Sequence, residues 1–350
     1  MIPPGSTIGI LGGGQLGRML AVSAAQLGYR CHIYAPQEDS VAAEVSAAFT
    51  CAAWDDLAAL KQFAEGCAVV TYEFENVPVA PLAAALSDKL APSTRALEVA
   101  QDRLAEKQFV ERLGGRPAPF AAVDDAAGLA AAIDRIGLPG IVKTRRDGYD
   151  GKGQWRLASA SDAQAVPLDR GGLIYEGMVR FAAEFSVILA RTAAGDLCFW
   201  DSAENVHEGG ILSRSTVPAG PAVAAQVEEA RELARAVAEA LDYVGVLTLE
   251  FFATEDGPVF NEMAPRVHNS GHWSIEGAVI SQFENHIRAI CGLPLGNTDR
   301  VASPVVMRNL LGEHMQQLGE LLADPHAHLH LYGKADIRKG RKMGHVTQVG

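Results

Sequence analysis

Residues 246–263 read VLTLEFFATEDGPVFNEM, in which two apolar runs flank the turn Thr254-Glu255-Asp256-Gly257. Apolar runs of this length around a glycine-containing turn predict a β-hairpin. If the hairpin is symmetric about Asp256, Glu250 on the first strand lies directly opposite Glu262 on the second, with Cβ atoms about 4.5–5.5 Å apart. The stretch therefore predicts two facing carboxylates in otherwise apolar strands.

Two facing carboxylates repel each other, and a divalent cation between them relieves the repulsion. Oxygen ligands of this kind, completed by phosphate oxygens, are those that Mg²⁺ prefers. Asn261 faces the other side of an ideal strand, so its participation requires a β-bulge or the end of strand pairing, and Pro258 is compatible with either. The alternative is a pair of solvated glutamates on an edge hairpin. We expect Glu250 and Glu262 to be metal ligands.

The composition is that of a globular protein, with 350 residues, 48% of them hydrophobic and 21% charged. A chain of this length has room for two or three domains. The formal net charge of −12 disfavours nucleic-acid binding, which requires a basic surface. The five cysteines include no C-x-x-C pair, no apolar run is long enough for a membrane helix, and no signal peptide is recognisable. We expect a reduced, cytoplasmic protein without nucleic-acid or membrane partners.

The N-terminal residues 8–19 contain Gly12-x-Gly14-x-x-Gly17 after an apolar run, a spacing typical of dinucleotide sites. The acidic residue that should follow about 20 residues later is missing, because that position reads Ile33-Tyr34-Ala35-Pro36. The glycines still allow a ligand to approach the backbone and present amide donors at a helix start. We therefore predict a ligand-binding loop without NAD, and a tight turn without any ligand is the alternative.

The order of predicted elements indicates a mixed α/β and α+β chain. A β-α-β unit opens it, and residues 68–72 form a further buried strand that ends in acidic residues. One amphipathic helix over 97–113 then leads to a linker. The second unit contains a helix around 125–136, a hairpin around 144–154, strands near 172–175, 184–191 and 197–201, a helix over 222–241 and the hairpin over 245–263.

A second glycine-rich segment, residues 148–154 (GYDGKGQ), is typical of a flap that closes over polyphosphate, and Lys143 on the preceding strand can point at the same phosphates. An ordinary structural turn explains this segment equally well. Residues 173–179 predict a strand that offers backbone groups to an adenine edge, with Glu184 available for ribose hydroxyls. The basic residues of segment 334–342 lack interleaved aromatics, which favours a single phosphate monoester over nucleic acid as their ligand.

Taken together, these motifs resemble the ATP-grasp superfamily and, more narrowly, the 5-(carboxyamino)imidazole ribonucleotide synthase family. The resemblance covers nearly the whole chain. It rests on residues 12–19 (GGGQLGRM), 71–77 (TYEFENV), 101–103 (QDR), 148–154 (GYDGKGQ), 261–273 (NEMAPRVHNSGHW) and 340–345 (GRKMGH). It implies an ATP-grasp fold with an N-terminal Rossmann-like, parallel-sheet domain over 1–97, a lid subdomain over 98–175, a large subdomain with the metal site over 176–295, and a small C-terminal subdomain over 296–350.

The resemblance also implies roles for individual residues. Catalytic roles fall to Arg266, His268 and Asn269, as the bicarbonate pocket and proton-transfer group, and to Tyr149 and Asp150 in the flap. ATP contacts fall to Arg103, Lys143, Gly148, Tyr149, Asp150, Gly151, Lys152, Gly153, Gln154, Glu176, Gly177, Met178, Val179, Glu184, His207, Asn261 and Glu262. The residues implied to bind the ribonucleotide are Gln15, Leu16, Glu75, Lys334 and Arg341. Those implied to bind the metal are Glu250 and Glu262.

The implied activity is that of an ATP-dependent carbon–nitrogen ligase of purine biosynthesis. Bicarbonate and ATP form carboxyphosphate, which carboxylates the exocyclic amine of 5-aminoimidazole ribonucleotide. Mg²⁺ is the expected metal, with Mn²⁺ as the alternative. Neither NAD nor biotin is expected, and a homodimer is implied. The alternatives are another ATP-grasp enzyme, such as a formate-dependent glycinamide ribonucleotide transformylase or a biotin carboxylase, an NAD-dependent oxidoreductase, and a non-catalytic nucleotide sensor.

Overall fold

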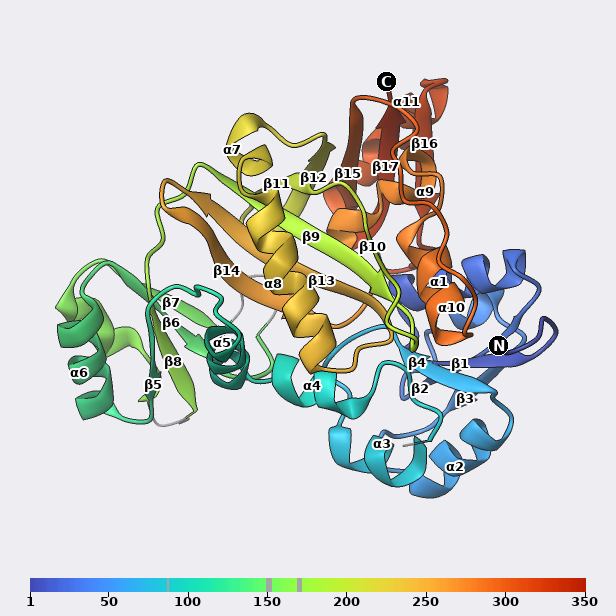
Figure 1. Ribbon diagram of the computed structural model, residues 1–350, viewed down its shortest axis with the longest axis horizontal. Helices are drawn as coiled ribbons and strands as arrows, with labels where there is room; N and C mark the ends of the chain where they lie inside the picture. The colour runs from blue at the N-terminus through green and yellow to red at the C-terminus, as the bar shows by residue number, and fades with distance from the viewer. Residues whose placement is uncertain (87, 149–152, 169–171) are drawn as a thin grey trace.

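The computed structural model describes residues 1–86, 88–148, 153–168 and 172–350, and the strands of these residues form three sheets. Figure 1 shows the largest sheet in the middle of the molecule, a small sheet at the left and the N-terminal sheet at the lower right. In these ranges no helix has the length and apolar character needed to cross a bilayer.

The N-terminal sheet is parallel, with strand order β3-β2-β1-β4. The predicted β-α-β opening and the strand near 68–72 are confirmed. The parallel order places the glycine loop after β1 beside the acidic residues after β4, because both loops leave the carboxyl edge of the sheet. The elements are β1 (Thr7–Leu11), α1 (Gln15–Gln26), β2 (Arg30–Ala35), the 3-10 helix η1 (Ala43–Val45), β3 (Ala48–Cys51), α2 (Leu57–Glu65), β4 (Val69–Tyr72) and α3 (Val79–Leu86).

The connection to the rest of the chain consists of two helices, α4 (Thr94–Ala100) and α5 (Arg103–Arg112). The prediction of one helix over 97–113 was wrong. The break occurs because Asp102 has extended backbone angles and caps α5, with its carboxylate accepting from the N–H groups of Leu104 and Ala105. The new helix start sets the direction in which α5 packs.

The small sheet is antiparallel, with strand order β5-β8-β6-β7, and is packed against one helix. The predicted hairpin around 144–154 is confirmed, since Lys143 pairs with Gln154. Its elements are β5 (Phe120–Val123), α6 (Ala126–Ile136), β6 (Gly140–Thr144), β7 (Gln154–Leu157), the 3-10 helix η2 (Ala160–Ala165) and β8 (Leu173–Gly177).

The large sheet has nine strands within the described residues, in the order β14-β13-β9-β11-β12-β15-β17-β16, with β10 paired to β9. Helices α8 and α10 pack against β9 and β13, and Figure 1 shows α8 lying across β13. The strands are β9 (Ala183–Arg191), β10 (Leu197–Phe199), β11 (Ala203–Glu208), β12 (Ile211–Val217), β13 (Gly245–Thr254), β14 (Gly257–Ala264), β15 (Val305–Leu311), β16 (Ala327–Leu331) and β17 (Lys342–Val349).

The helices around this sheet are α7 (Pro221–Ala224), α8 (Val227–Ala240), α9 (Ser274–Gly277), α10 (Gln282–Ile290) and α11 (Leu318–Ala323), with 3-10 helices η4 (Asn269–Gly271) and η5 (Gly312–Gln317). The predicted helix over 222–241 is therefore interrupted, because the backbone of Gln226 leaves helical geometry between α7 and α8. The predicted domain boundaries at 97, 175 and 295 stay a prediction.

Candidate active site

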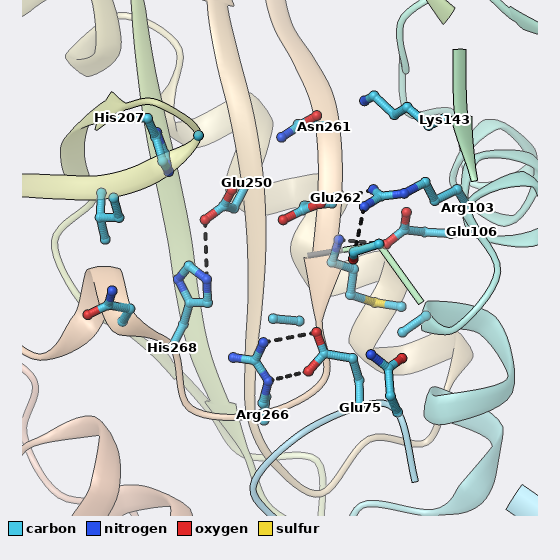
Figure 2. Close-up of a pocket in the computed structure, with 18 of the residues that line it drawn as sticks. Glu75, Arg103, Glu106, Lys143, His207, Glu250, Asn261, Glu262, Arg266 and His268 are labelled. Carbon is cyan, nitrogen blue, oxygen red and sulfur yellow. Dashed lines mark hydrogen bonds and ion pairs between the residues drawn. The ribbon is translucent and has the colours of Figure 1, made fainter. Parts of the chain in front are cut away.

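A cavity of about 730 Å³ lies between the N-terminal, small and large sheets, and we call it the central cavity. Gln15 and Glu75 reach it from the N-terminal sheet, Lys143 from the small sheet, and Glu250 and Glu262 from the large sheet. Figure 2 shows charged side chains from these different elements converging on one space. A ligand in this cavity would touch all three parts of the fold.

The hairpin that forms one wall pairs Glu250 directly with Glu262, as predicted. The route to this pairing differs from the predicted one. The strands meet at Thr254 and Gly257, so an undistorted hairpin would place Asn261 opposite Glu250. A β-bulge after Glu250 inserts Asn261 as the extra residue and thereby shifts Glu262 into register. The bulge also explains how Asn261 and Glu262 can both line the central cavity.

The two carboxylates have opposite electrostatic environments. Burial, reinforced by the negative charge of Glu262, raises the pKa of Glu250 to about 7. Burial also disfavours the charged form of Glu262, but the Arg103 guanidinium, with Nη1 3.1 Å from Oε2, holds the pKa of Glu262 below its usual value. A cation between the carboxylates would relieve this repulsion, and the pair fits Mg²⁺. The described residues contain no group of three acidic, histidine or cysteine side chains that could hold a metal ion.

Helix α5 places three charged side chains against the bulged strand. Arg103, Glu106 and Lys107 lie at positions i, i+3 and i+4 and so share one face. Glu106 Oε1 accepts from the Met263 N–H at 2.6 Å, and Lys107 Nζ donates to the Asn261 carbonyl at 3.1 Å. Burial raises the pKa of Glu106 to about 8. The sequence analysis missed both residues, although two charged residues on the buried face of a predicted helix were a usable signal.

Lys143 lines the central cavity, as the phosphate role requires, and its ammonium also pairs with Glu176. Lys143 Nζ lies 2.9 Å from Glu176 Oε2, and Lys107 Nζ lies 3.4 Å from the same oxygen. Burial alone would raise the pKa of Glu176, but the two lysines lower it to about 2. The carboxylate of Glu176 is therefore paired with two buried lysines, and its side chain does not line the cavity.

The neighbouring adenine candidates are partly committed to backbone bonds. The N–H of Gly177 donates to the Pro119 carbonyl at 2.9 Å, and the N–H of Met178 donates to the Pro139 carbonyl at 3.0 Å. Adenine contacts from this segment would then use the carbonyl groups or Val179. Met178 is exposed, and none of the residues 177–179 lines the central cavity.

Glu184 and His207, predicted to contact ribose and nucleotide, both line the central cavity and form an ion pair with Nδ1 and Oε2 2.6 Å apart. Burial lowers the pKa of His207, but the contact with Glu184 and the charge of Glu250 outweigh it, so the net shift is upward. The structure thus brings this pair beside the proposed metal carboxylates.

Arg266 and Glu75, predicted to hold bicarbonate and ribonucleotide respectively, bind each other. Arg266 Nε donates to Glu75 Oε2 at 2.5 Å and Nη2 donates to Oε1 at 3.0 Å, a two-pronged pair visible in Figure 2. Burial opposes the charged form of Glu75, but Arg266 keeps its pKa below the usual value. Each residue reaches the cavity with its main polar groups already paired.

His268 and Asn269 follow at the same wall. His268 Nε2 lies 3.3 Å from Glu250 Oε1, and burial together with the positive charge of Arg266 lowers the pKa of His268 well below its usual value. The imidazole is therefore neutral near pH 7. Both amide atoms of Asn269 are buried without a hydrogen-bond partner among the described residues. Because Asn269 lines the cavity, its amide is suited to a polar ligand.

The N-terminal glycine loop holds a carboxylate of the chain itself. Glu73, at the end of β4, accepts from the N–H groups of Gly14 and Gly17, the latter at 2.7 Å. Two of the amide donors that the sequence offers to a ligand are therefore occupied by Glu73. A Cβ on Gly12 would lie 2.3 Å from Glu73 Cγ, so the glycine spacing makes room for this side chain. Gln15 and Leu16, beyond the filled loop, do line the central cavity.

The predicted phosphate residues near the C-terminus lie at the margin of the site. Lys334 Nζ donates to the Lys342 carbonyl at 2.9 Å and lies 5.6 Å from the centre of the Tyr332 ring. Arg341 pairs with Asp336, its Nη1 3.0 Å from Oδ2. Neither Lys334 nor Arg341 lines the central cavity, whereas Tyr332 and Lys342 do. Lys342 belongs to the basic segment predicted to bind a phosphate, and Tyr332 was not selected.

The glycine-rich flap is described only at its ends. The Gly148 carbonyl accepts from Arg103 Nη2 at 3.4 Å, and Gly153 has a φ of +70°. Gly148 and Gln154 line the cavity. Tyr149, Asp150, Gly151 and Lys152 lie outside the described residues, so their predicted roles stay predictions.

Comparison with known proteins agrees with this architecture. Family models match residues 5–101 (ribonucleotide synthetase preATP-grasp domain), 108–283 (ATP-grasp domain) and 305–350 (phosphoribosylaminoimidazole carboxylase C-terminal domain). The chain is 51% identical to the N5-carboxyaminoimidazole ribonucleotide synthase of Brucella melitensis, over 99% of this chain and 97% of that protein. This chain belongs to the N5-carboxyaminoimidazole ribonucleotide synthase family. The Bacillus subtilis enzyme of this family is 41% identical over 99% of the chain and 92% of its own length.

Solved structures of N5-carboxyaminoimidazole ribonucleotide synthases share the fold. The Staphylococcus aureus enzyme complexed with ADP has a TM-score of 0.95 at 37% identity, covering 100% of this chain and 94% of that chain. The Aspergillus clavatus enzyme in complex with ADP and 5-aminoimidazole ribonucleotide has a TM-score of 0.90 at 31% identity, covering 99% and 94%. The resemblance and the ATP-grasp fold inferred from the sequence are confirmed, and membership of this family decides against the oxidoreductase and transformylase alternatives.

Proposed function

We propose that this chain carboxylates the exocyclic amine of 5-aminoimidazole ribonucleotide with bicarbonate and ATP, in purine biosynthesis. The family relatives carry the name of this activity, and a related structure holds ADP together with this ribonucleotide. The observation that carries the proposal is the bulged hairpin, because it brings Glu250 and Glu262 together at a cavity shared with Lys143 and the loop after β1.

In the proposed reaction an oxygen of bicarbonate attacks the γ-phosphorus of ATP, the bond from that phosphorus to the bridging oxygen breaks, and ADP leaves. The amine then attacks the carboxyl carbon of carboxyphosphate, the carbon–oxygen bond to phosphate breaks, and the amine loses a proton. The products are ADP, phosphate and a carbamate. These steps require mainly positioning of the reactants and neutralisation of charge.

The residues of the central cavity can position the reactants and neutralise their charge. Arg103 and Lys143 place positive charge beside the phosphates, and Glu250 and Glu262 would hold Mg²⁺ or Mn²⁺. When bound, this ion neutralises charge on the phosphate oxygens. His268, neutral near pH 7, is suited to accept the proton that the amine loses.

Bicarbonate binding is proposed at Arg266 and Asn269. The guanidinium of Arg266 is a planar fork that matches a planar anion, but Glu75 occupies its Nε and Nη2. Bicarbonate would therefore share Arg266 through Nη1, whose backbone bond to the Val267 carbonyl is longer at 3.1 Å. The amide of Asn269, which has no hydrogen-bond partner among the described residues, offers a donor to the same anion.

The test is ADP release with each acceptor and carbon source, together with ¹³C NMR detection of a carbamate from ¹³C-bicarbonate. We expect ADP and carbamate to form in equal amounts only when bicarbonate and 5-aminoimidazole ribonucleotide are both present. Turnover supported by formate alone would refute the proposal. Glu262→Ala should abolish turnover and leave cooperative unfolding intact, because the lost ion pair with Arg103 is offset by relief of the repulsion between Glu262 and Glu250.

We further propose that the protein is a homodimer, as the family resemblance implies. Sedimentation equilibrium at micromolar concentration tests this separately from the activity. A mass equal to one chain at all concentrations would contradict it.

A further inference from the structure

Strand β14 lies at the edge of the large sheet, so one side of its backbone has no neighbouring strand in that sheet. The N–H and C=O groups on that side bond partly to another segment of backbone and partly to side chains. At Phe260 the partner is another segment of chain, since the Phe260 N–H donates to the Arg116 carbonyl at 2.8 Å and Pro117 bridges to Phe260. This pairing ends where the bulge begins. Beyond it, the side chains of α5 provide the contacts.

The two α5 side chains supply the same donor and acceptor groups that a neighbouring strand would supply. A neighbouring strand would offer β14 an N–H donor and a carbonyl acceptor. Lys107 offers the donor to the Asn261 carbonyl, and Glu106 offers the acceptor to the Met263 N–H. Both side chains are buried, Lys107 at 1% and Glu106 at 2% relative exposure. Burying an ammonium and a carboxyl group at these positions carries a desolvation cost that apolar residues would avoid, and the raised pKa of Glu106 reflects that cost.

We propose that Glu106 and Lys107 are positioning residues for the metal site: together they stand in for a neighbouring strand and hold the bulge that turns Glu262 toward Glu250. The inference rests on the proposed function, because it takes this carboxylate pair as the metal site. Lys107 does not line the central cavity, and Glu106, which does, commits Oε1 to the Met263 N–H rather than to a substrate. They act through the backbone on both sides of Glu262, while Arg103, from the same helix face, contacts the Glu262 carboxylate.

Lys107 also joins the bulge to the small sheet. Its ammonium lies between the Asn261 carbonyl and Glu176 Oε2, and the same oxygen of Glu176 pairs with Lys143. A single buried ammonium therefore connects the proposed metal strand with the lysine proposed for the ATP phosphates. Loss of Lys107 should disturb both metal and ATP binding, whereas loss of Glu106 should disturb mainly the metal.

The test compares variants that remove a contact with variants that keep it. Lys107→Met removes the donor and Lys107→Arg retains one, while Glu106→Met removes the acceptor and Glu106→Gln retains one. Lys89→Met is the matched control, since Lys89 Nζ also donates to buried carbonyls, those of Ala64 and Cys67 at 2.7 and 2.8 Å, far from the cavity. The direct readout is Mn²⁺ binding in the presence of ADP, measured by electron paramagnetic resonance. The kinetic readouts are the Mg²⁺ concentration for half-maximal turnover and the KM values for ATP and for the ribonucleotide.

We expect Lys107→Met and Glu106→Met to weaken Mn²⁺ binding about 10- to 100-fold, the usual range for residues that orient metal ligands. Lys107→Arg, Glu106→Gln and Lys89→Met should stay near the wild-type value, with KM for the ribonucleotide little changed in all variants. Folded methionine variants with wild-type Mn²⁺ affinity overturn the inference. Failure of both methionine variants to fold also overturns it, because the contacts would then serve the fold rather than the site. If Glu262→Ala itself binds Mn²⁺ normally, the proposed metal site fails instead.

Discussion

Acid should destabilise this protein through His286, which joins the N-terminal sheet to the large sheet. His286 lies on α10 and is fully buried. Its Nδ1 accepts from the Val246 N–H at 3.1 Å, so Nε2 carries the proton toward Thr71 Oγ1 at 2.8 Å. A second proton on Nδ1 would face an N–H donor. Burial accordingly lowers the pKa of His286 to about 3.

The sign and size of the effect follow from proton linkage. The histidine pKa is about 6.5 in the unfolded chain, so the unfolded chain binds the proton more tightly than the folded chain. The free energy of unfolding therefore decreases as the pH falls from about 6.5 to the folded-state pKa of about 3. At pH 5 the cost is about 2 kcal/mol, since the stability decreases by about 1.4 kcal/mol for each pH unit below 6.5. Above pH 7 His286 contributes no pH dependence.

The measurement is the free energy of unfolding in urea at pH 7.5, 6.0 and 5.0, for the wild type, His286→Asn and the exposed-residue control His326→Asn. Other buried histidines add to the wild-type slope, so the decisive quantity is the difference between variants. His286→Asn should be less stable at pH 7.5 because it leaves a small cavity, yet it should lose about 2 kcal/mol less than the wild type on acidification to pH 5. Equal losses in wild type and His286→Asn would refute the assignment.

Three further outcomes are expected. Gly12→Ala should destabilise the fold by about 1–3 kcal/mol in urea unfolding, because φ is +114° and a Cβ would press on Glu73, and by more than Gly114→Ala, where no atom lies within 4 Å. A smaller effect at Gly12 than at Gly114 would contradict the packing of Glu73. Arg266→Lys should lower kcat/KM for bicarbonate at least about tenfold, since an ammonium cannot serve carboxylate and bicarbonate as a fork. Asn269→Ala should raise KM for bicarbonate without lowering stability by more than about 0.5 kcal/mol, because its amide bonds no described residue.

Local patterns in the sequence predicted those parts of the fold that local physics determines. The alternation of apolar residues and the turn at 254–257 were sufficient for the hairpin, and the glycine loop after β1 was sufficient for the first β-α-β unit. The pairing of Glu250 with Glu262 was predicted from a symmetric turn, and it is reached through a bulge at Asn261 instead. The two differences offset each other: the pairing next to the turn is shifted by one residue from the predicted one, and the bulge shifts it back by one residue at Glu250.

The residues that sequence analysis missed depend on contacts between distant segments. Glu73 was noted only as acidic, because its partners Gly14 and Gly17 are brought to it by sheet order rather than by spacing. Glu106 and Lys107 belong to a helix whose start was misplaced. Their charge on a buried helix face was a signal, but their contacts with β14 could not be predicted without the cap at Asp102, which sets where α5 begins.

The filled glycine loop has a consequence for competition among anions. A phosphate approaching the amides of Gly14 and Gly17 has to displace a carboxylate that is tethered to the next strand, and tethering gives that carboxylate an effective concentration that free metabolites rarely match. An anion bound at the amino end of α1 would lie beside Gln15 and Leu16, so the tethered carboxylate of Glu73 leaves that part of the central cavity to the ligand these two residues line.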